Sequence, residues 1–162
     1  MKNNYAKIDD FSIKNLDDEI QADRLCVEFL TAFHKHLLDD QGLDPLLAGS
    51  RARGADYFLR DFVIADRREN IFRIAADRVR QFGGNWYIIS NMEPNLKELG
   101  DILAGVAAFY VYCASLELVT QELSDEITAH CLALPWYQER IDAFHDIKDD
   151  GFIRWNEECP VK

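Results

Sequence analysis

Apolar residues recur along most of the chain at intervals of three and four positions, which places them on one face of an α-helix. The first such segment begins after Asn15, the expected N-cap, and its apolar pattern ends at Gly42. The same spacing predicts further helices over 50–65, 66–82, 94–118, 124–135 and 136–144. Residues 1–14 lack the pattern and are expected to form a loosely attached N-terminal arm.

The boundaries of these helices depend on a few residues. Asp66 with Glu69 three positions later is typical of a capping box that opens the third helix. Gly83-Gly84 should end or break that helix, so 86–89 is either helix continuing past a break or a short extended piece. Pro135 either kinks the helix that precedes it or starts a sixth one.

The most hydrophobic segment begins at Pro94 and continues to about residue 118. Part of this helix would have a small diameter, because it contains the small residues Gly100, Ala104, Gly105, Ala107 and Ala108. Small side chains let a neighbouring helix approach closely, so we expect this segment to be central and buried. The sequence therefore predicts an all-α fold, a compact bundle of five or six helices with a central buried helix at about 94–118, in a single helical domain over 15–162.

Composition agrees with a folded domain and adds an uneven charge. The 162 residues are 48% hydrophobic, enough to build a core, which argues against disorder. The net charge of −11 opposes general attraction to nucleic acid or anionic lipid. Residues 51–80, however, carry eight arginines against five acidic residues, a local charge of +3. This is the one segment to which an anion would be attracted.

The cysteines and the N-terminus indicate the cellular compartment of the protein. Cysteines at 26, 113, 131 and 159 are far apart, without a Cys-x-x-Cys motif, and the first three lie in apolar helical patterns typical of small core residues in a reducing compartment. The N-terminus has no apolar stretch able to act as a signal peptide. The longest uncharged run, Ile102–Leu116, has fifteen residues, and a membrane span needs about 20. We expect a cytoplasmic protein with no membrane partner.

The arginine-rich segment supplies the first candidate site. Arginine forks suit phosphate and carboxylate groups, and arginine and large aromatic residues dominate protein interfaces. An anion- or partner-binding patch would use Arg53, Arg67, Arg68, Arg78, Trp86 and Tyr87. The alternative is a solvated or salt-bridged helix face, supported by the pairs Asp56–Arg60, Glu69–Arg73 and Arg73–Asp77, each four residues apart.

The C-terminal tail resembles an EF-hand calcium loop. Aspartate lies at loop positions 1 and 5 (Asp146 and Asp150), Gly151 at position 6 and Glu157 at position 12. Position 3 is Lys148, which places an ammonium where an oxygen ligand should face the ion. The resemblance implies a weak calcium site formed by Asp146, Asp150 and Glu157. The alternative is that Gly151 ends a helix and the acidic residues are solvated.

Residues 50–120 resemble the core-binding helical domain of tyrosine recombinases in the order of their features. The segments that carry the resemblance are Tyr57–Phe62, Val79–Phe82 and Leu99–Tyr112, closed by Leu118-Val119. The resemblance implies a helical domain that associates with DNA. Such a domain should be basic where it grips DNA, whereas this chain is acidic outside 51–80, so nucleic acid is not the favoured partner.

No catalytic or cofactor motif stands out in the chain, which has no Gly-x-Ser-x-Gly, no P-loop and no Gly-x-Gly-x-x-Gly. The expected function is therefore non-catalytic, through contact with a protein partner or a second copy of the chain, with no cofactor unless the tail binds calcium. Two alternatives remain. One is anion or small-ligand binding between helices by the 51–80 segment, and the other is association with nucleic acid.

Overall fold

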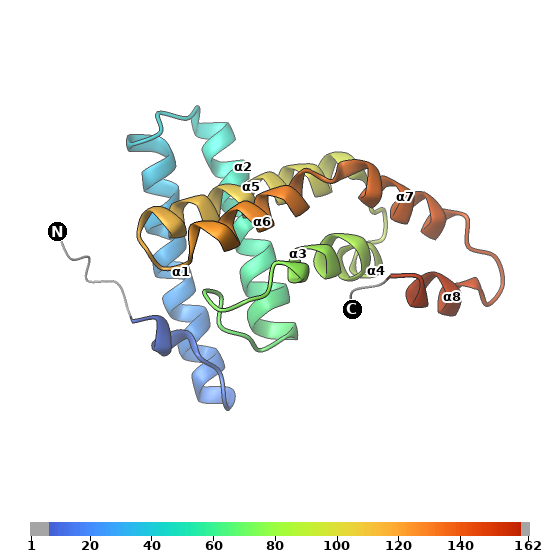
Figure 1. The fold of residues 1–162 in the computed structure, drawn as a ribbon, viewed down its shortest axis with the longest axis horizontal. Coiled ribbons are helices and arrows are strands. Elements are labelled where there is room, and N and C mark those ends of the chain that lie inside the picture. Colours follow the sequence, from blue (N-terminus) through green and yellow to red (C-terminus); the bar gives the residue numbers. More distant parts are fainter. Residues whose placement is uncertain (1–6, 160–162) are drawn as a thin grey trace.

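The computed structural model describes residues 7–159, in which all regular structure is helical and no strand occurs (Figure 1). The long helix α1 (Leu16–Asp39) lies beside α2 (Pro45–Asp56) and runs antiparallel to it. Helix α2 continues directly into a π-helical stretch, η2 (Tyr57–Asp66). A second continuous run is formed by α3 (Asp77–Gln81), the π-helical η3 (Phe82–Trp86) and α4 (Tyr87–Ser90).

The expected all-α bundle with a central buried helix is confirmed. The central helix is α5 (Leu96–Ser115), which packs against both α2 and the antiparallel α6 (Gln121–Leu132). The chain then continues through α7 (Leu134–His145) and the short α8 (Gly151–Glu157). Pro135 lies in the first turn of α7, so it starts a helix rather than kinking α6.

The small residues of α5 allow α2 to approach it closely, as expected. A Cβ atom added at Gly105 would lie 2.3 Å from the backbone oxygen of Arg51. On the other side of the contact, a Cβ at Gly54 would lie 2.8 Å from the Cα of Ile102. The two backbones therefore touch at a pair of glycines, and this contact fixes α2 against α5.

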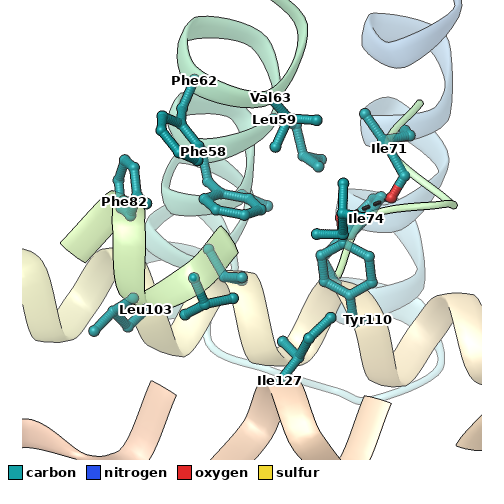
Figure 2. Close-up of a cluster of buried hydrophobic side chains, with 14 of the residues drawn as sticks. Phe58, Leu59, Phe62, Val63, Ile71, Ile74, Phe82, Leu103, Tyr110 and Ile127 are labelled. Carbon is teal, nitrogen blue, oxygen red and sulfur yellow. Dashed lines mark hydrogen bonds between the residues drawn. The ribbon is translucent and has the colours of Figure 1, made fainter. Parts of the chain in front are cut away.

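The chain between η2 and α3 departs from the prediction, since 67–76 is not helical. Asp66 and Glu69 do not form a capping box, because Asp66 ends η2 and the Glu69 carboxylate accepts hydrogen bonds from the Arg78 guanidinium. Figure 2 shows two residues of this loop, Ile71 and Ile74, buried in the main core. The Tyr110 hydroxyl donates a 2.7 Å hydrogen bond to the Ile71 carbonyl and holds the loop against α5.

The prediction that Gly83-Gly84 ends or breaks the third helix is wrong, because α3 continues through η3 into α4 and 86–89 is helical. Both glycines are buried within η3, under aromatic rings from α7. A Cβ at Gly83 would lie 2.7 Å from the Tyr137 ring, and one at Gly84 would lie 2.4 Å from the Trp136 ring. The glycines are needed because α7 packs directly on the helix backbone.

The described part of the N-terminal arm is packed on the bundle rather than loosely attached. It contains a short 3₁₀ helix, η1 (Ile8–Phe11), in which Phe11 is buried and contacts the Phe72 ring edge-on at 4.8 Å. The side-chain nitrogen of Asn70 donates a 2.8 Å hydrogen bond to the Ile8 carbonyl. Asn70 also donates to the Ser12 hydroxyl, and Arg73 pairs with Asp9. An aromatic anchor and several polar contacts to the 70–73 loop therefore hold a segment whose sequence has no helical period.

The core cysteines should be chemically inert in the folded protein. No disulfide joins the four described cysteines, and burial raises the pKa of the Cys131 thiol to about 12 and those of Cys26 and Cys113 as well. Because only the thiolate is nucleophilic, these three thiols should not react with Ellman's reagent at mildly alkaline pH. All should react in guanidinium, and equal labelling rates in native and unfolded protein would contradict this burial.

Candidate functional site

Three of the arginines singled out from the sequence are held by residues of the same chain. The Arg78 guanidinium donates to both carboxylate oxygens of Glu69, at 2.6 and 2.8 Å. Arg68 has a left-handed backbone (φ 53°) and places its Nε 3.1 Å from the carboxylate of Glu19 in α1. The Arg67 guanidinium lies 5.0 Å above the Phe62 ring. These three arginines therefore support the fold, and none of them lines the cleft described below.

The two aromatic candidates have different positions. Trp86 is partly buried, and its ring contacts those of Tyr57 and Phe82, with centroids 5.7 and 5.8 Å away. Tyr87 is fully buried, and its hydroxyl donates a 2.8 Å hydrogen bond to the Glu98 carboxylate of α5. Tyr87 therefore belongs to the core, but its hydroxyl sets the position of a carboxylate at the surface.

Arg53 lies beside a cleft of about 430 Å³ between α2, the beginning of η2 and the first two turns of α5. This volume is within the range of small-molecule sites. The residues that line it are Ser50, Arg53, Gly54, Tyr57, Asn91, Glu98, Asp101 and Ile102. Gly54 and Ile102 meet where the two helices touch, so the glycine contact that fixes α2 on α5 also forms part of the cleft wall.

The cleft carries opposite charges on its two helices. Arg53, on α2, is exposed and forms no ion pair with any residue in the described part of the chain. Glu98 and Asp101, on α5, supply two carboxylates, of which Glu98 accepts the bond from Tyr87 and Asp101 lies 3.6 Å from the exposed Lys97. A bound molecule would therefore meet one cationic and two anionic side chains.

Neutral hydrogen-bonding groups lie in the same cleft. The Asn91 amide donates to the Tyr57 hydroxyl at 3.2 Å and to the Tyr87 carbonyl at 2.8 Å, which fixes its orientation. Burial raises the pKa of Tyr57, so its hydroxyl stays protonated at neutral pH. With its oxygen already accepting from Asn91, the Tyr57 hydroxyl can donate its proton to a ligand.

Sequence reasoning identified Arg53 and missed the other polar residues of this cleft. Tyr57, Asn91, Glu98 and Asp101 come from segments up to 44 positions apart, and no spacing connects them. The feature that could have located the site is the run of small residues in α5. It predicted that a neighbouring helix comes close, and that neighbour is the helix that carries Arg53.

The tail does not form an EF-hand loop. Helix α8 begins at Gly151, loop position 6, so the backbone carbonyl needed at position 7 belongs to a helix. Within residues 7–159 no three Asp, Glu, His or Cys side chains are grouped as metal ligands, so Asp146, Asp150 and Glu157 do not converge. The alternative, that Gly151 ends a helix, is also wrong, because Gly151 starts α8 and the preceding helix α7 already ends at His145.

Comparisons of the chain with protein-family models, with curated proteins and with solved structures found no match. Without a match, the cleft is interpreted from its own chemistry.

By length and composition, α5 is the one helix in the described part of the chain that could cross a membrane, a criterion that core helices of soluble proteins also meet.

Proposed function

We propose that this protein binds a small zwitterion, a molecule of amino-acid size with an amine and a carboxylate, in the cleft between α2 and α5. The observation that carries the proposal is the pairing of an unneutralised Arg53 with Glu98 and Asp101 around one cleft. The guanidinium suits a carboxylate, and the two acidic side chains suit an ammonium group. We further propose that binding is non-catalytic.

Three features of the cleft support binding. Glu98 is held by the buried Tyr87 hydroxyl, and Asn91 by two hydrogen bonds, so both polar groups are positioned before a ligand arrives. The α-helix changes to a π-helix at Tyr57, on the cleft wall. π-Helical turns within α-helices occur frequently at functional sites.

The nucleic-acid alternative receives less support, because Arg67, Arg68 and Arg78 are each engaged within the chain. The reduced cysteines agree with the proposed cytoplasmic location. Contact with a protein partner or a second copy, the other expected mode of action, stays a prediction.

A thermal-shift panel of the free amino acids, with their N-acetyl and carboxamide derivatives, tests the proposal. A free amino acid at about 100 times its Kd should stabilise the fold by about 2.7 kcal/mol and raise Tm by about 8 °C. Derivatives that lack either charge should give much smaller shifts. The shift should disappear in Arg53→Gln and in the double variant Glu98→Gln with Asp101→Asn.

Arg154→Gln is the matched control, because Arg154 is equally cationic but lies on α8 and is 86% exposed. Its Tm should rise with the amino acid as in the unmodified protein. The proposal is wrong if no amino acid raises Tm, or if the rise persists in Arg53→Gln.

A further inference from the structure

The cleft between α2 and α5 carries more negative than positive charge. Glu98 and Asp101 supply two carboxylates, and Arg53 is the one cationic side chain that the described residues place in its lining. Lys97 lies 3.6 Å from Asp101, but its side chain is 90% exposed and outside the lining, and such surface pairs contribute little. The single amine of a simple zwitterion would therefore leave one acidic side chain of the cleft without a cation.

The two carboxylates lie close enough together to contact one small ligand. Glu98 and Asp101 are three positions apart on α5, which places them on the same helix face with about 5–6 Å between their Cβ atoms. Glu98 is held in position by the buried Tyr87 hydroxyl at 2.8 Å. Like charges at this spacing repel each other, and a ligand with two cationic groups would relieve the repulsion.

The negative charge also extends to the Tyr57 side of the cleft. Burial is the largest cause of the raised pKa of Tyr57, and the negative charges of Asp61 and Glu98 raise this pKa further, against the hydrogen bond from Asn91, which lowers it. Asp61 lies four positions beyond Tyr57 on η2. A third carboxylate therefore adds to the potential that attracts a cation into the cleft.

We infer that the ligand of this cleft is a basic amino acid with a side-chain ammonium, such as lysine or ornithine. Its carboxylate would pair with Arg53, and its two ammonium groups with Glu98 and Asp101, so that every charge in the lining has a partner. A neutral amino acid would leave one carboxylate unpaired, and an acidic one would bring a second anion to a cleft with one cation. The inference rests on the proposed function and narrows its ligand class.

Isothermal titration calorimetry with matched ligands tests the inference. Norleucine is lysine without the side-chain ammonium, and cadaverine is lysine without the carboxylate. Lysine should bind the unmodified protein about tenfold more tightly than either, because each analogue loses one charge-assisted contact. Nε-acetyl-lysine, whose side chain is uncharged, should lose the same factor.

Two variants test whether the preference for lysine comes from the paired carboxylates. Glu98→Gln and Asp101→Asn each remove one charge and keep a hydrogen-bonding side chain of the same size. In either variant lysine should bind no more tightly than norleucine, since the second ammonium has no anionic partner. Glu126→Gln, at an exposed position on α6 and outside the cleft, is the matched control for net charge and should keep the tenfold preference.

The possible failures of the inference and of the proposed function are distinguishable. Equal affinities for lysine and norleucine in the unmodified protein, or a preference for lysine that survives both variants, would overturn the inference and leave amino-acid binding intact. Cadaverine binding as tightly as lysine would overturn both, because Arg53 would then bind no carboxylate. Absence of binding by any amino acid would contradict the proposed function, and the inference with it.

Discussion

Gly105→Ala is expected to destabilise the protein by about 2–3 kcal/mol, although alanine favours helices more than glycine does. The added Cβ would lie 2.3 Å from the Arg51 backbone oxygen and 3.1 Å from the Ala55 backbone nitrogen. Both atoms belong to the backbone of α2, so no side chain can rotate away, and α2 must move off α5. Urea denaturation followed by circular dichroism would measure the loss.

Gly100→Ala in the same helix provides the matched control. A Cβ there meets no atom within 4 Å, so the substitution should stabilise α5 by about 0.5–1 kcal/mol through helix propensity alone. The two substitutions make the same chemical change five positions apart and should have opposite signs. Equal effects at Gly100 and Gly105 would mean that α2 and α5 are not in backbone contact.

Arg140→Ala should be the second large loss, about 3 kcal/mol. The buried Arg140 guanidinium donates to the Gly84 carbonyl at 2.9 Å, the Trp155 carbonyl at 2.8 Å and the Asn85 side-chain oxygen at 3.3 Å. It also lies 4.0 Å from the Trp155 ring centre, and the Trp155 indole donates back to the Arg140 carbonyl. Removing it leaves buried acceptors unsatisfied and separates α7 from η3 and α8.

Two measurements would follow this change. Chemical denaturation gives the free energy of unfolding, and tryptophan emission should move to longer wavelength as Trp155 becomes hydrated. Arg154→Ala, at an exposed position on α8, should change stability by less than about 0.5 kcal/mol. A loss below about 1 kcal/mol for Arg140→Ala would show that α8 is not fastened through this guanidinium.

The sequence predicted the helices whose apolar faces are continuous, and it failed where distant contacts determine the backbone. The spacing in 94–118 and its small residues identified α5 and its close neighbour correctly. The capping-box signal at Asp66 and Glu69 failed because Arg78, nine positions beyond Glu69, binds that carboxylate. Gly83-Gly84 by itself favours the end of a helix. The helix continues because Trp136 and Tyr137 of α7 pack on these glycines, a contact between distant segments that the local sequence does not predict.

The same distinction applies to the candidate site. Arg60 contacts Asp56 four positions earlier, as local pairing predicted, but it also donates to both carboxylate oxygens of Asp23 in α1. Arg68 pairs with Glu19 and Arg73 pairs with Asp9, and these contacts depend on the fold as well. The cleft around Arg53 exists because α2 touches α5 at two glycines. Residue type could nominate Arg53, and only the packing of those helices could show which carboxylates lie near it.

The most direct test of the proposed function is a titration of ¹⁵N-labelled protein with free amino acids, followed by backbone amide shifts. Binding in the cleft predicts saturable shifts at Arg53, Tyr57, Asn91 and Glu98, with the amides of α8 unchanged. The same titration of Arg53→Gln should give no saturable change. Saturable shifts confined to residues outside the cleft, or none for any amino acid, would contradict the assignment of function to the cleft between α2 and α5.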